Sequence, residues 1–346
     1  MKRVGVVGHF AFGKEYLDGQ TVKTKVLTKE LQRTLGEDEI LTIDTHGGRK
    51  RLLQLPFLLI SLLRSCKNII ILPARNGLRV IAPLLVLINI FFHRKLHYVV
   101  IGGWLPQFLK GRCLLAQVLK RFSAVYVETK TMKKALEAKG FSNVVVMPNC
   151  KYLPILSEDE LVYPDAEPYK LCTFSRVMKE KGIEDAVNAV QAVNAQIGRT
   201  VFSLDIYGQI DPSQVEWFEK LNQSFPEYVR YAGMVPFDQT TIVLKGYFAL
   251  LFPTRFYTEG IPGTVIDAYA AGVPVIASRW ESFDDIVKPE FSGIGYSFFE
   301  EGALEKKLHE IIRNIQCVHQ MRLQCLQEAQ KYIPQNVINT ILERLF

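Results

Sequence analysis

The chain has 346 residues, about twice the usual length of one domain, which predicts two domains with a core in each. Hydrophobic residues make up 48% and charged residues 22%, so disorder, a collagen and a coiled-coil rod are all disfavoured. The net charge of +7 conceals an asymmetry: residues 1–150 hold 24 Lys or Arg against 9 Asp or Glu, and residues 151–346 hold 18 against 26. The basic half predicts a polyanionic or anionic-lipid partner, and nucleic acid is disfavoured because no recognition motif accompanies the charge.

Short runs rich in Val, Ile and Tyr alternate with helical stretches along the first half, a pattern typical of parallel sheets with crossover helices. We expect strands at residues 3–7, 39–43, 68–72, 97–101, 124–127 and 144–147. We expect helices at residues 20–35, 52–64, 78–91, 111–122 and 131–138. Residues 1–150 are therefore predicted to form one doubly wound domain.

Two apolar segments of this domain, residues 49–67 and 79–95, are bracketed by basic residues. The second has 13 uncharged residues in a row but contains Pro83, whereas a membrane-spanning helix needs about 20 apolar residues. Neither segment should span a membrane. Each can lie at the membrane interface with its basic flanks on lipid headgroups, or can be a core-facing helix (residues 52–63 and 80–92) of an α/β domain.

The stretch from residue 151 to 169 is rich in proline and acidic residues, which predicts a linker. A second series follows, with strands expected at residues 171–174, 202–207, 228–231, 248–252 and 273–277. Helices are expected at residues 182–196, 213–223, 263–271 and 302–330. Residues 170–331 are thus a second domain, and a last helix at residues 336–345, within the segment 332–346, is expected to pack back on the first domain.

The six cysteines are scattered, with no C-x-x-C pair, which argues against a structural zinc site and a disulfide scaffold. The basic N-terminus has too short and too glycine-rich an apolar stretch for a signal peptide. A cytoplasmic location is the expectation.

The most specific stretch is "FPTRFYTEGIPGTVIDAYAAGVPVIAS", residues 252–278. A strand is expected to end before a loop with Glu259, and a helix to begin near Gly263. The exposed N–H groups of Gly263 and Thr264, with the helix dipole, would form an anion site. Asp267, one turn further, would suit a pair of vicinal hydroxyls.

This block resembles the retaining glycosyltransferases of family 4, which have the α/β GT-B fold of two Rossmann-like domains facing across a cleft. Their pattern E-G-x-P-x-x-x-x-E-A-x-A-x-G-x-P-V-I-A is matched here with Asp267 in place of the second Glu. A second block, "FSRVMKEKGIEDAV", resembles the segment whose Arg and Lys hold the donor diphosphate, which implies that role for Arg176 and Lys181. Near the N-terminus, "YLDGQTVKTKVLTKEL" resembles the family's glycine-rich loop, which places Gly19 at the donor phosphates.

The family's usual first-domain His has no counterpart, because Gly102, Gly103 and Trp104 stand where it would fall. His97 is expected at the wrong end of its strand. His9 and Trp104 are the candidate acceptor-side residues, with a structural role as the alternative for each.

The resemblance implies transfer with retention from a nucleoside-diphosphate sugar, most often UDP-linked. Arg176, Lys181 and the helix at Gly263 would stabilise the leaving charge, and Glu259 would hold the donor sugar. Because no D-x-D occurs, no metal cofactor is expected. The acceptor would dock on the basic domain. A polyprenyl-diphosphate-linked saccharide at the inner membrane face fits, as in bacterial capsule, exopolysaccharide or O-antigen synthesis.

Two alternatives remain. One is a non-catalytic nucleotide-sugar-binding or membrane-adaptor protein of the same fold, which the complete set of site residues disfavours. The other is a nicotinamide-dependent oxidoreductase, which is disfavoured because "VVGHFAFG" stands where G-x-G-x-x-G would follow the first strand.

Overall fold

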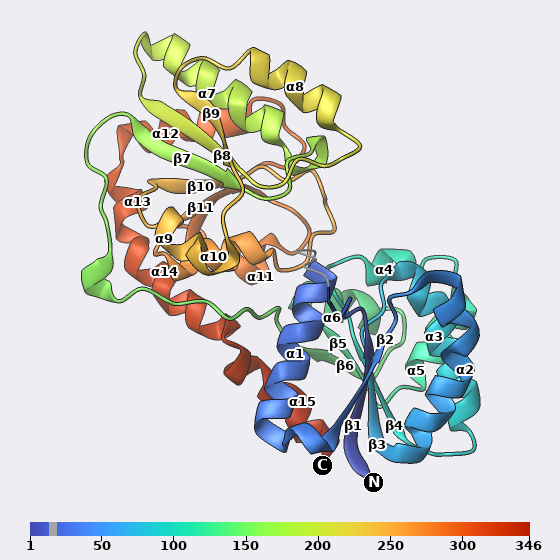
Figure 1. Cartoon of the computed structure of the whole chain (residues 1–346). Coiled ribbons are helices and arrows are strands. Elements are labelled where there is room, and N and C mark those ends of the chain that lie inside the picture. The colour runs from blue at the N-terminus through green and yellow to red at the C-terminus, as the bar shows by residue number, and fades with distance from the viewer. Residues whose placement is uncertain (14–18) are drawn as a thin grey trace. The chain divides into compact units, whose positions relative to one another are not determined.

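The computed structural model describes residues 1–13 and 19–346, apart from the side chains of residues 48–52 and 237. The chain divides into two compact units. Unit 1 contains Met1–Tyr152 and Tyr332–Phe346, and unit 2 contains Leu153–Lys331 (Figure 1). The boundary between the units therefore lies between Tyr152 and Leu153, and the C-terminal segment belongs to unit 1.

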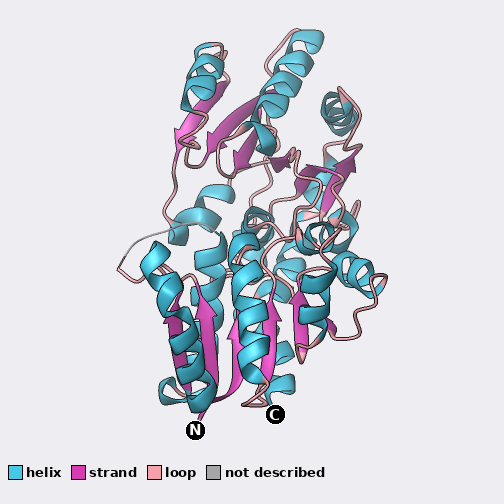
Figure 2. Cartoon of the chain, turned by 90° about the vertical axis from the view of Figure 1, so that its right-hand side faces the viewer, coloured by secondary structure: helices cyan, strands magenta, loops and turns pink. Residues whose placement is uncertain are grey.

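Unit 1 is a six-stranded, wholly parallel sheet with the strand order β2-β1-β3-β4-β5-β6 (Figure 2). Its strands are β1 (Lys2–Gly8), β2 (Ile40–Asp44), β3 (Cys66–Ile71), β4 (Lys95–Val99), β5 (Ala124–Val127) and β6 (Val144–Val146). Its helices are α1 (Gly19–Leu35), α2 (Gly48–Ser65), α3 (Arg75–Asn89), α4 (Leu105–Phe108), α5 (Cys113–Lys120), α6 (Lys130–Glu137) and α15 (Pro334–Leu345).

Both faces of this sheet are covered, which is why its strands are almost continuously apolar. Helices α1 and α15 pack on one face, where Leu27 and Ile341 join the same core cluster as Val4 (Figure 1). Helices α2, α3, α5 and α6 pack on the other, where Leu59 and Leu85 join a second cluster. Helix α15 starts with a proline at its first position, where the missing N–H costs nothing.

Unit 2 is a second six-stranded parallel sheet, with the order β12-β11-β10-β7-β8-β9. Its strands are β7 (Tyr169–Phe174), β8 (Phe202–Tyr207), β9 (Val229–Gly233), β10 (Ala249–Phe252), β11 (Val275–Ser278) and β12 (Gly293–Tyr296). Its helices are α7 (Ile183–Ile197), α8 (Val215–Gln223), α9 (Thr240–Leu244), α10 (Gly263–Ala270), α11 (Phe283–Ile286), α12 (Ala303–Arg313), α13 (Gln316–Gln320) and α14 (Arg322–Ala329).

The prediction of one helix over residues 302–330 is wrong, because α12, α13 and α14 are separate. Asn314 leaves the helical region with φ −148° and ends α12. Helix α14 then packs on α10, while α12 packs on α7. The sequence also did not predict β12, α4 or α9, which are all short. The helix expected at residues 111–122 is the shorter α5, preceded by α4.

The two apolar segments form α2 and α3, and each helix has two different sides. Leu59, Leu62 and Leu85 are buried against the sheet, so the core-helix expectation is met on that side. Other apolar side chains of the same segments are exposed, among them Phe57 on α2 at 76% and Phe91 just after α3 at 81%. Among the described residues no helix is both long and apolar enough to cross a membrane.

Candidate functional site

The donor-site motif occupies the turn from β10 into α10. Helix α10 begins at Gly263, with Pro262 as an extended N-cap residue (ψ 131°) whose side chain caps nothing. A Cβ built on Gly263 would meet no described atom within 4 Å, so the space beside this end of the helix is open. The first backbone N–H groups of α10 are therefore available to an acceptor outside the helix.

Thr264, the second residue of α10, supplies independent evidence that a ligand belongs here. The residue is only 9% exposed, and its Oγ1 has no hydrogen-bond partner among the described residues. A buried hydroxyl without a partner costs stability, so it marks a place where a polar ligand atom fits. Its position at a helix N-terminus favours an anion such as phosphate.

Lys181 and Glu259, which are 78 residues apart in the sequence, meet in an ion pair. Lys181 Nζ lies 2.7 Å from Glu259 Oε2, and both side chains are about four-fifths buried. Thr254 Oγ1 donates to the same carboxylate oxygen at 3.3 Å. The ammonium group also lies over the rings of Phe252 (5.5 Å) and Phe256 (5.2 Å). The two predicted site residues are thus held in one place by unit 2 itself.

Two glycines make this arrangement possible. Gly182 has φ +70°, and a Cβ there would lie 1.9 Å from the carbonyl oxygen of Pro253. Gly208 has φ +131°, and a Cβ there would lie 1.8 Å from the carbonyl oxygen of Ser175. Only glycine permits both the positive φ and the close approach of these loops. The turn after β7, with Arg176 and Lys181, is thereby packed against the loop that carries Glu259.

Arg176 lies differently from Lys181. Its guanidinium is half exposed and is 3.6 Å from Asp211 Oδ2, in the loop after β8. This loose pair leaves the cation accessible to a ligand, because exposed pairs of this kind contribute little to stability. Asp267 is 3% exposed, so only a small part of its surface is open to a ribose.

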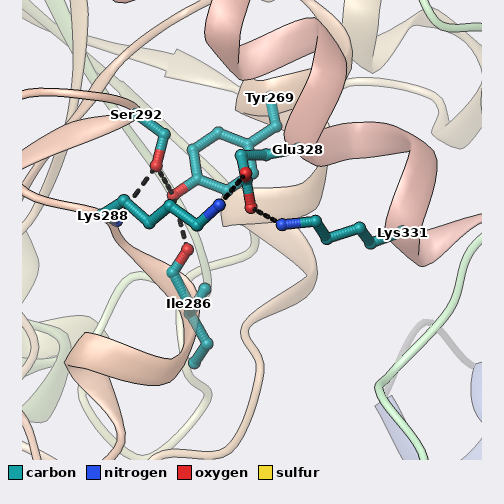
Figure 3. A network of polar contacts seen from close by, with 6 residues as sticks. All are labelled: Tyr269, Ile286, Lys288, Ser292, Glu328 and Lys331. Carbon is teal, nitrogen blue, oxygen red and sulfur yellow. Dashed lines mark hydrogen bonds and ion pairs between the residues drawn. The ribbon is translucent and has the colours of Figure 1, made fainter.

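Helix α10 is anchored by polar contacts at its far end (Figure 3). The Tyr269 hydroxyl donates to the carbonyl oxygen of Ile286 (3.1 Å) and is 3.0 Å from Ser292 Oγ. Ser292 Oγ accepts from the backbone N–H of Lys288, whose Nζ is 2.6 Å from Glu328 on α14. These contacts fix α10 relative to α14 and to the segment before β12.

The sequence analysis missed Arg322, a fully buried arginine on α14. Its guanidinium donates to the carbonyl oxygens of Tyr247 (2.6 Å), Phe248 (3.1 Å) and Gly272 (3.3 Å). Burial lowers the pKa of this guanidinium to about 10. The arginine therefore ties α14 to the residues just before β10 and just after α10.

In unit 1, His9 follows β1 and contacts a second histidine. His9 Nδ1 is 2.8 Å from Thr21 Oγ1, and His9 Nε2 is 3.1 Å from His46 Nδ1. His46 follows β2 and was not singled out from the sequence. The neighbouring Asp44 is partly buried, which raises the pKa of its carboxyl, but backbone N–H bonds from His46 and from the loop after β1 bring that pKa below the usual range.

The loop after β4 is held by a buried ion pair that the sequence did not reveal. Lys23 Nζ lies 2.6 Å from Glu128 Oε1, and both side chains are 2% exposed. The same carboxylate oxygen accepts from the backbone N–H of Gly102 (3.0 Å), and Trp104 Nε1 donates to the carbonyl oxygen of Ile101 (2.7 Å). The pair therefore shapes the segment where the acceptor-side Trp104 was expected.

Other predicted residues lie away from these clusters. Gly19 is exposed as the first residue of α1, and residues 16–18 of its predicted loop lie outside the described residues. His97 is fully buried in β4, beside the Tyr126 hydroxyl, and burial lowers its pKa to about 4. Trp280, two residues after the donor-site block, is 2% exposed between Phe252 and Phe283, so it is a packing residue.

In residues 1–13 and 19–346, no group of three or more His, Cys, Asp or Glu side chains is arranged to hold a metal ion. The expectation of a metal-independent reaction stays a prediction.

Comparisons with known proteins agree on the architecture. Residues 168–314, less than half of the chain, match the family model described as Glycosyl transferases group 1. No curated protein gives a significant match.

Solved structures resemble the whole chain at low sequence identity. Alr3699/HepE from Anabaena, in complex with UDP and glucose, is 13% identical, with a TM-score of 0.74 over 98% of both chains. Sucrose-phosphate synthase (tll1590) from Thermosynechococcus elongatus is 14% identical, with a TM-score of 0.74 over 99% of this chain and 98% of that one. The pneumococcal O-GlcNAc transferase GtfA is 17% identical (TM-score 0.63), and the match covers 84% of this chain but 59% of GtfA. The protein therefore has the GT-B fold of two Rossmann-like domains, and most of its second unit matches the group 1 glycosyltransferase model.

Proposed function

We propose that the protein is a retaining, metal-independent glycosyltransferase of family 4. It would move a hexosyl group from a nucleoside-diphosphate sugar, UDP-linked by the precedent of its structural neighbours, to a lipid-linked saccharide. The observation that carries the proposal is the Lys181–Glu259 pair, placed by β7 and β10 in the segment that matches the group 1 model. Structures of the same fold were solved with UDP and with UDP-glucose.

The diphosphate is the group that unit 2 is best equipped to bind. Lys181, the accessible Arg176 and the open N-terminus of α10 supply positive charge and N–H donors, and Thr264 supplies a hydroxyl. As the glycosidic bond breaks, negative charge grows on the leaving phosphate. Donors fixed before the reaction then stabilise the transition state more than the bound substrate.

Glu259 is assigned to the donor sugar and Asp267 to the ribose. On donor binding, the phosphates would share Lys181 with Glu259, and the carboxylate would accept hydrogen bonds from sugar hydroxyls. The acceptor hydroxyl would attack on the face from which the diphosphate leaves, and its proton would pass to the leaving phosphate oxygen. This route retains the anomeric configuration and requires no protein nucleophile.

The acceptor is assigned to unit 1, with Gly19 on the donor phosphates and His9 and Trp104 on the acceptor side. Residues 1–150 hold 24 basic and 9 acidic residues. This excess of positive charge would favour an anionic lipid carrier and a peripheral position on the inner membrane face. Exposed apolar side chains on α2 and α3 support this position. The flanking Arg49, Lys50 and Arg51 side chains lie outside the described residues. Capsule, exopolysaccharide or O-antigen synthesis is the proposed setting.

The first test is a thermal-shift screen against UDP, GDP, ADP, CMP, dTDP and their sugars, with and without EDTA. At a ligand concentration of 100 Kd, binding stabilises a protein by about 2.7 kcal/mol, and for a unit of this size 1 kcal/mol corresponds to about 2–4 °C. We expect one nucleoside diphosphate to raise Tm by about 5–10 °C, regardless of EDTA. A sugar of that same nucleotide should then support transfer to a membrane lipid extract, with NMR showing retention of the anomeric configuration.

Two lysine variants test whether the nucleotide that raises Tm binds at the proposed donor site. Lys181→Ala should lose most of the shift, whereas Lys220→Ala, which removes an exposed lysine paired with Glu216, should keep it. No shift with any nucleotide, or an equal shift in both variants, would contradict the proposed donor site.

A further inference from the structure

An apolar pocket of unit 1 has no role in the assignments above, apart from that of Trp104, which lines it. It has a volume of about 700 Å³, within the range of about 300–1,000 Å³ typical of small-molecule sites. Its apolar walls come from α2, α3 and the loops after β3 and β4, and they include Leu55, Pro73, Val80, Ile81 and Trp104. The cavity lies where β2 and β3 end on either side of β1, the point at which the strand order reverses. Ligands of doubly wound sheets bind at this kind of position.

The polar part of the pocket lining is small, and most of it is hydrogen-bonded to other groups of the protein. Asp44 accepts backbone N–H bonds from Phe10 (3.0 Å), Phe12 (3.2 Å) and His46 (2.9 Å), which compensate its charge. Gln20 Nε2 donates to the carbonyl oxygen of Leu72 (3.2 Å). The pocket interior therefore favours an apolar ligand group over a polar one.

Arginines mark the exposed side of the pocket. Arg75 belongs to the lining, is exposed, and has its guanidinium 5.6 Å from the Trp104 ring centre. Arg79, one turn further along α3, lies 5.1 Å from the Phe108 ring centre. Among the described residues, neither guanidinium is within 4 Å of a carboxylate oxygen. Arg75 in the pocket lining and Arg79 one turn away are thus two cations that have no carboxylate partner among the described residues, which suits a phosphate or diphosphate.

Apolar surface continues from the pocket along the same two helices. Val80 both lines the pocket and is 42% exposed, and further apolar side chains are exposed on α2 (Leu53 and Phe57) and just after α3 (Ile90 and Phe91). A ligand chain leaving the pocket would therefore stay on apolar surface. Such a surface, in the basic half of the chain, suits an amphipathic ligand with a negatively charged head.

We infer that this pocket binds the first part of a polyisoprenoid chain, with the attached diphosphate at Arg75 and Arg79. The inference rests on the proposed function, because it assigns the lipid carrier of the proposed acceptor to this pocket. It adds that unit 1 extracts the start of the chain from the bilayer into an internal cavity. A headgroup bound only at the surface would leave the pocket unused.

The test is direct binding of farnesyl diphosphate to the full-length protein by isothermal titration calorimetry. Farnesol, which lacks the charge, and inorganic pyrophosphate, which lacks the chain, are the comparison ligands. Val80→Trp fills the pocket from a partly exposed position, so the variant should fold. Leu87→Trp makes the same kind of change at an exposed site of α3 that does not line the pocket. Arg75→Ala removes the cation at the entrance.

We expect farnesyl diphosphate to bind the wild type at least tenfold more tightly than either comparison ligand. Val80→Trp and Arg75→Ala should each weaken its binding at least tenfold, and Leu87→Trp should change it less than twofold. Equal binding to the wild type and to Val80→Trp, or equal binding of pyrophosphate and farnesyl diphosphate, would overturn the inference.

UDP titrated into the same proteins separates the two proposals. The UDP affinity should be the same in the wild type and in Val80→Trp, because Val80 is not among the residues assigned to the donor. If UDP binds and farnesyl diphosphate does not, the pocket assignment is wrong and the donor assignment stands. If farnesyl diphosphate binds in a Val80-dependent way and no nucleotide binds, the pocket assignment stands and the proposed function is wrong.

Discussion

The buried pair Lys23–Glu128 gives the sharpest prediction about stability. Both side chains are 2% exposed, with Nζ and Oε1 2.6 Å apart, and Lys23 Nζ also donates to the carbonyl oxygen of Val100 (3.1 Å). Lys23→Met keeps the length of the side chain but leaves the Glu128 carboxylate buried without its cation. Removing one partner of a buried pair costs about 3–5 kcal/mol, because the remaining charge is not compensated.

The assay is thermal and urea unfolding of the full-length protein. For a unit of 150–250 residues, 1 kcal/mol corresponds to about 2–4 °C in Tm, so the unfolding transition of unit 1 should fall by about 6–20 °C. The double variant Lys23→Met/Glu128→Gln should recover most of this loss. It buries no net charge and keeps a carbonyl oxygen for the N–H of Gly102.

The control is Lys220→Met, which breaks an exposed pair (2.8 Å, both side chains at least 74% exposed). Exposed pairs contribute about 0–1 kcal/mol, so Tm should change by at most a few degrees. If Lys23→Met is as mild as this control, or if the double variant is no more stable than the single one, the reasoning about the buried charge is refuted.

Three further predictions concern unit 2. Glu259→Gln should lower the transfer rate at least about 100-fold while UDP binding and Tm are kept, and a fully active variant in a radiolabelled-sugar assay would remove Glu259 from the site. Gly182→Ala should lower Tm and UDP affinity, because its Cβ would lie 1.9 Å from the Pro253 carbonyl oxygen. Gly198→Ala, with φ +77° but no described atom within 4 Å, should cost only the backbone strain of about 1–2 kcal/mol, and equal effects in the two variants would contradict this. Arg322→Met should destabilise unit 2 by about 3 kcal/mol or more in urea unfolding, since three buried carbonyls lose their donor, and an unchanged midpoint would show that they are satisfied in another way.

Much of the architecture could be predicted from local sequence patterns. Apolar β-branched runs separated by amphipathic stretches gave the strands of both sheets, except the short β12, because each buried strand has to be apolar on both faces. The helix start at Gly263 was likewise predictable, since proline followed by glycine favours a first helical turn. That Lys181 and Glu259 belong to one donor site became an expectation only through the resemblance of two separate motifs to one family, and their ion pair was not expected.

Helix breaks were not predictable in the same way. Residues 302–330 look like one continuous amphipathic helix, yet three helices form, because α12 packs on α7 while α14 packs on α10. The change of partner requires a change of direction at Asn314. The apolar periodicity of a segment does not specify which surface the helix will pack against.

The sequence by itself determined the class of fold, the two-domain division and the residue types expected at a donor site, because these depend on local composition and spacing. Only the tertiary structure decided that Lys23 meets Glu128, 105 residues away, that Arg322 reaches three carbonyls, and that α2 and α3 enclose a pocket. These features depend on the order of strands in each sheet, because that order brings together residues that are far apart in the chain. A periodic pattern specifies whether a segment is a helix or a strand and which of its sides is buried. The surface that it packs against depends on the packing of the whole chain.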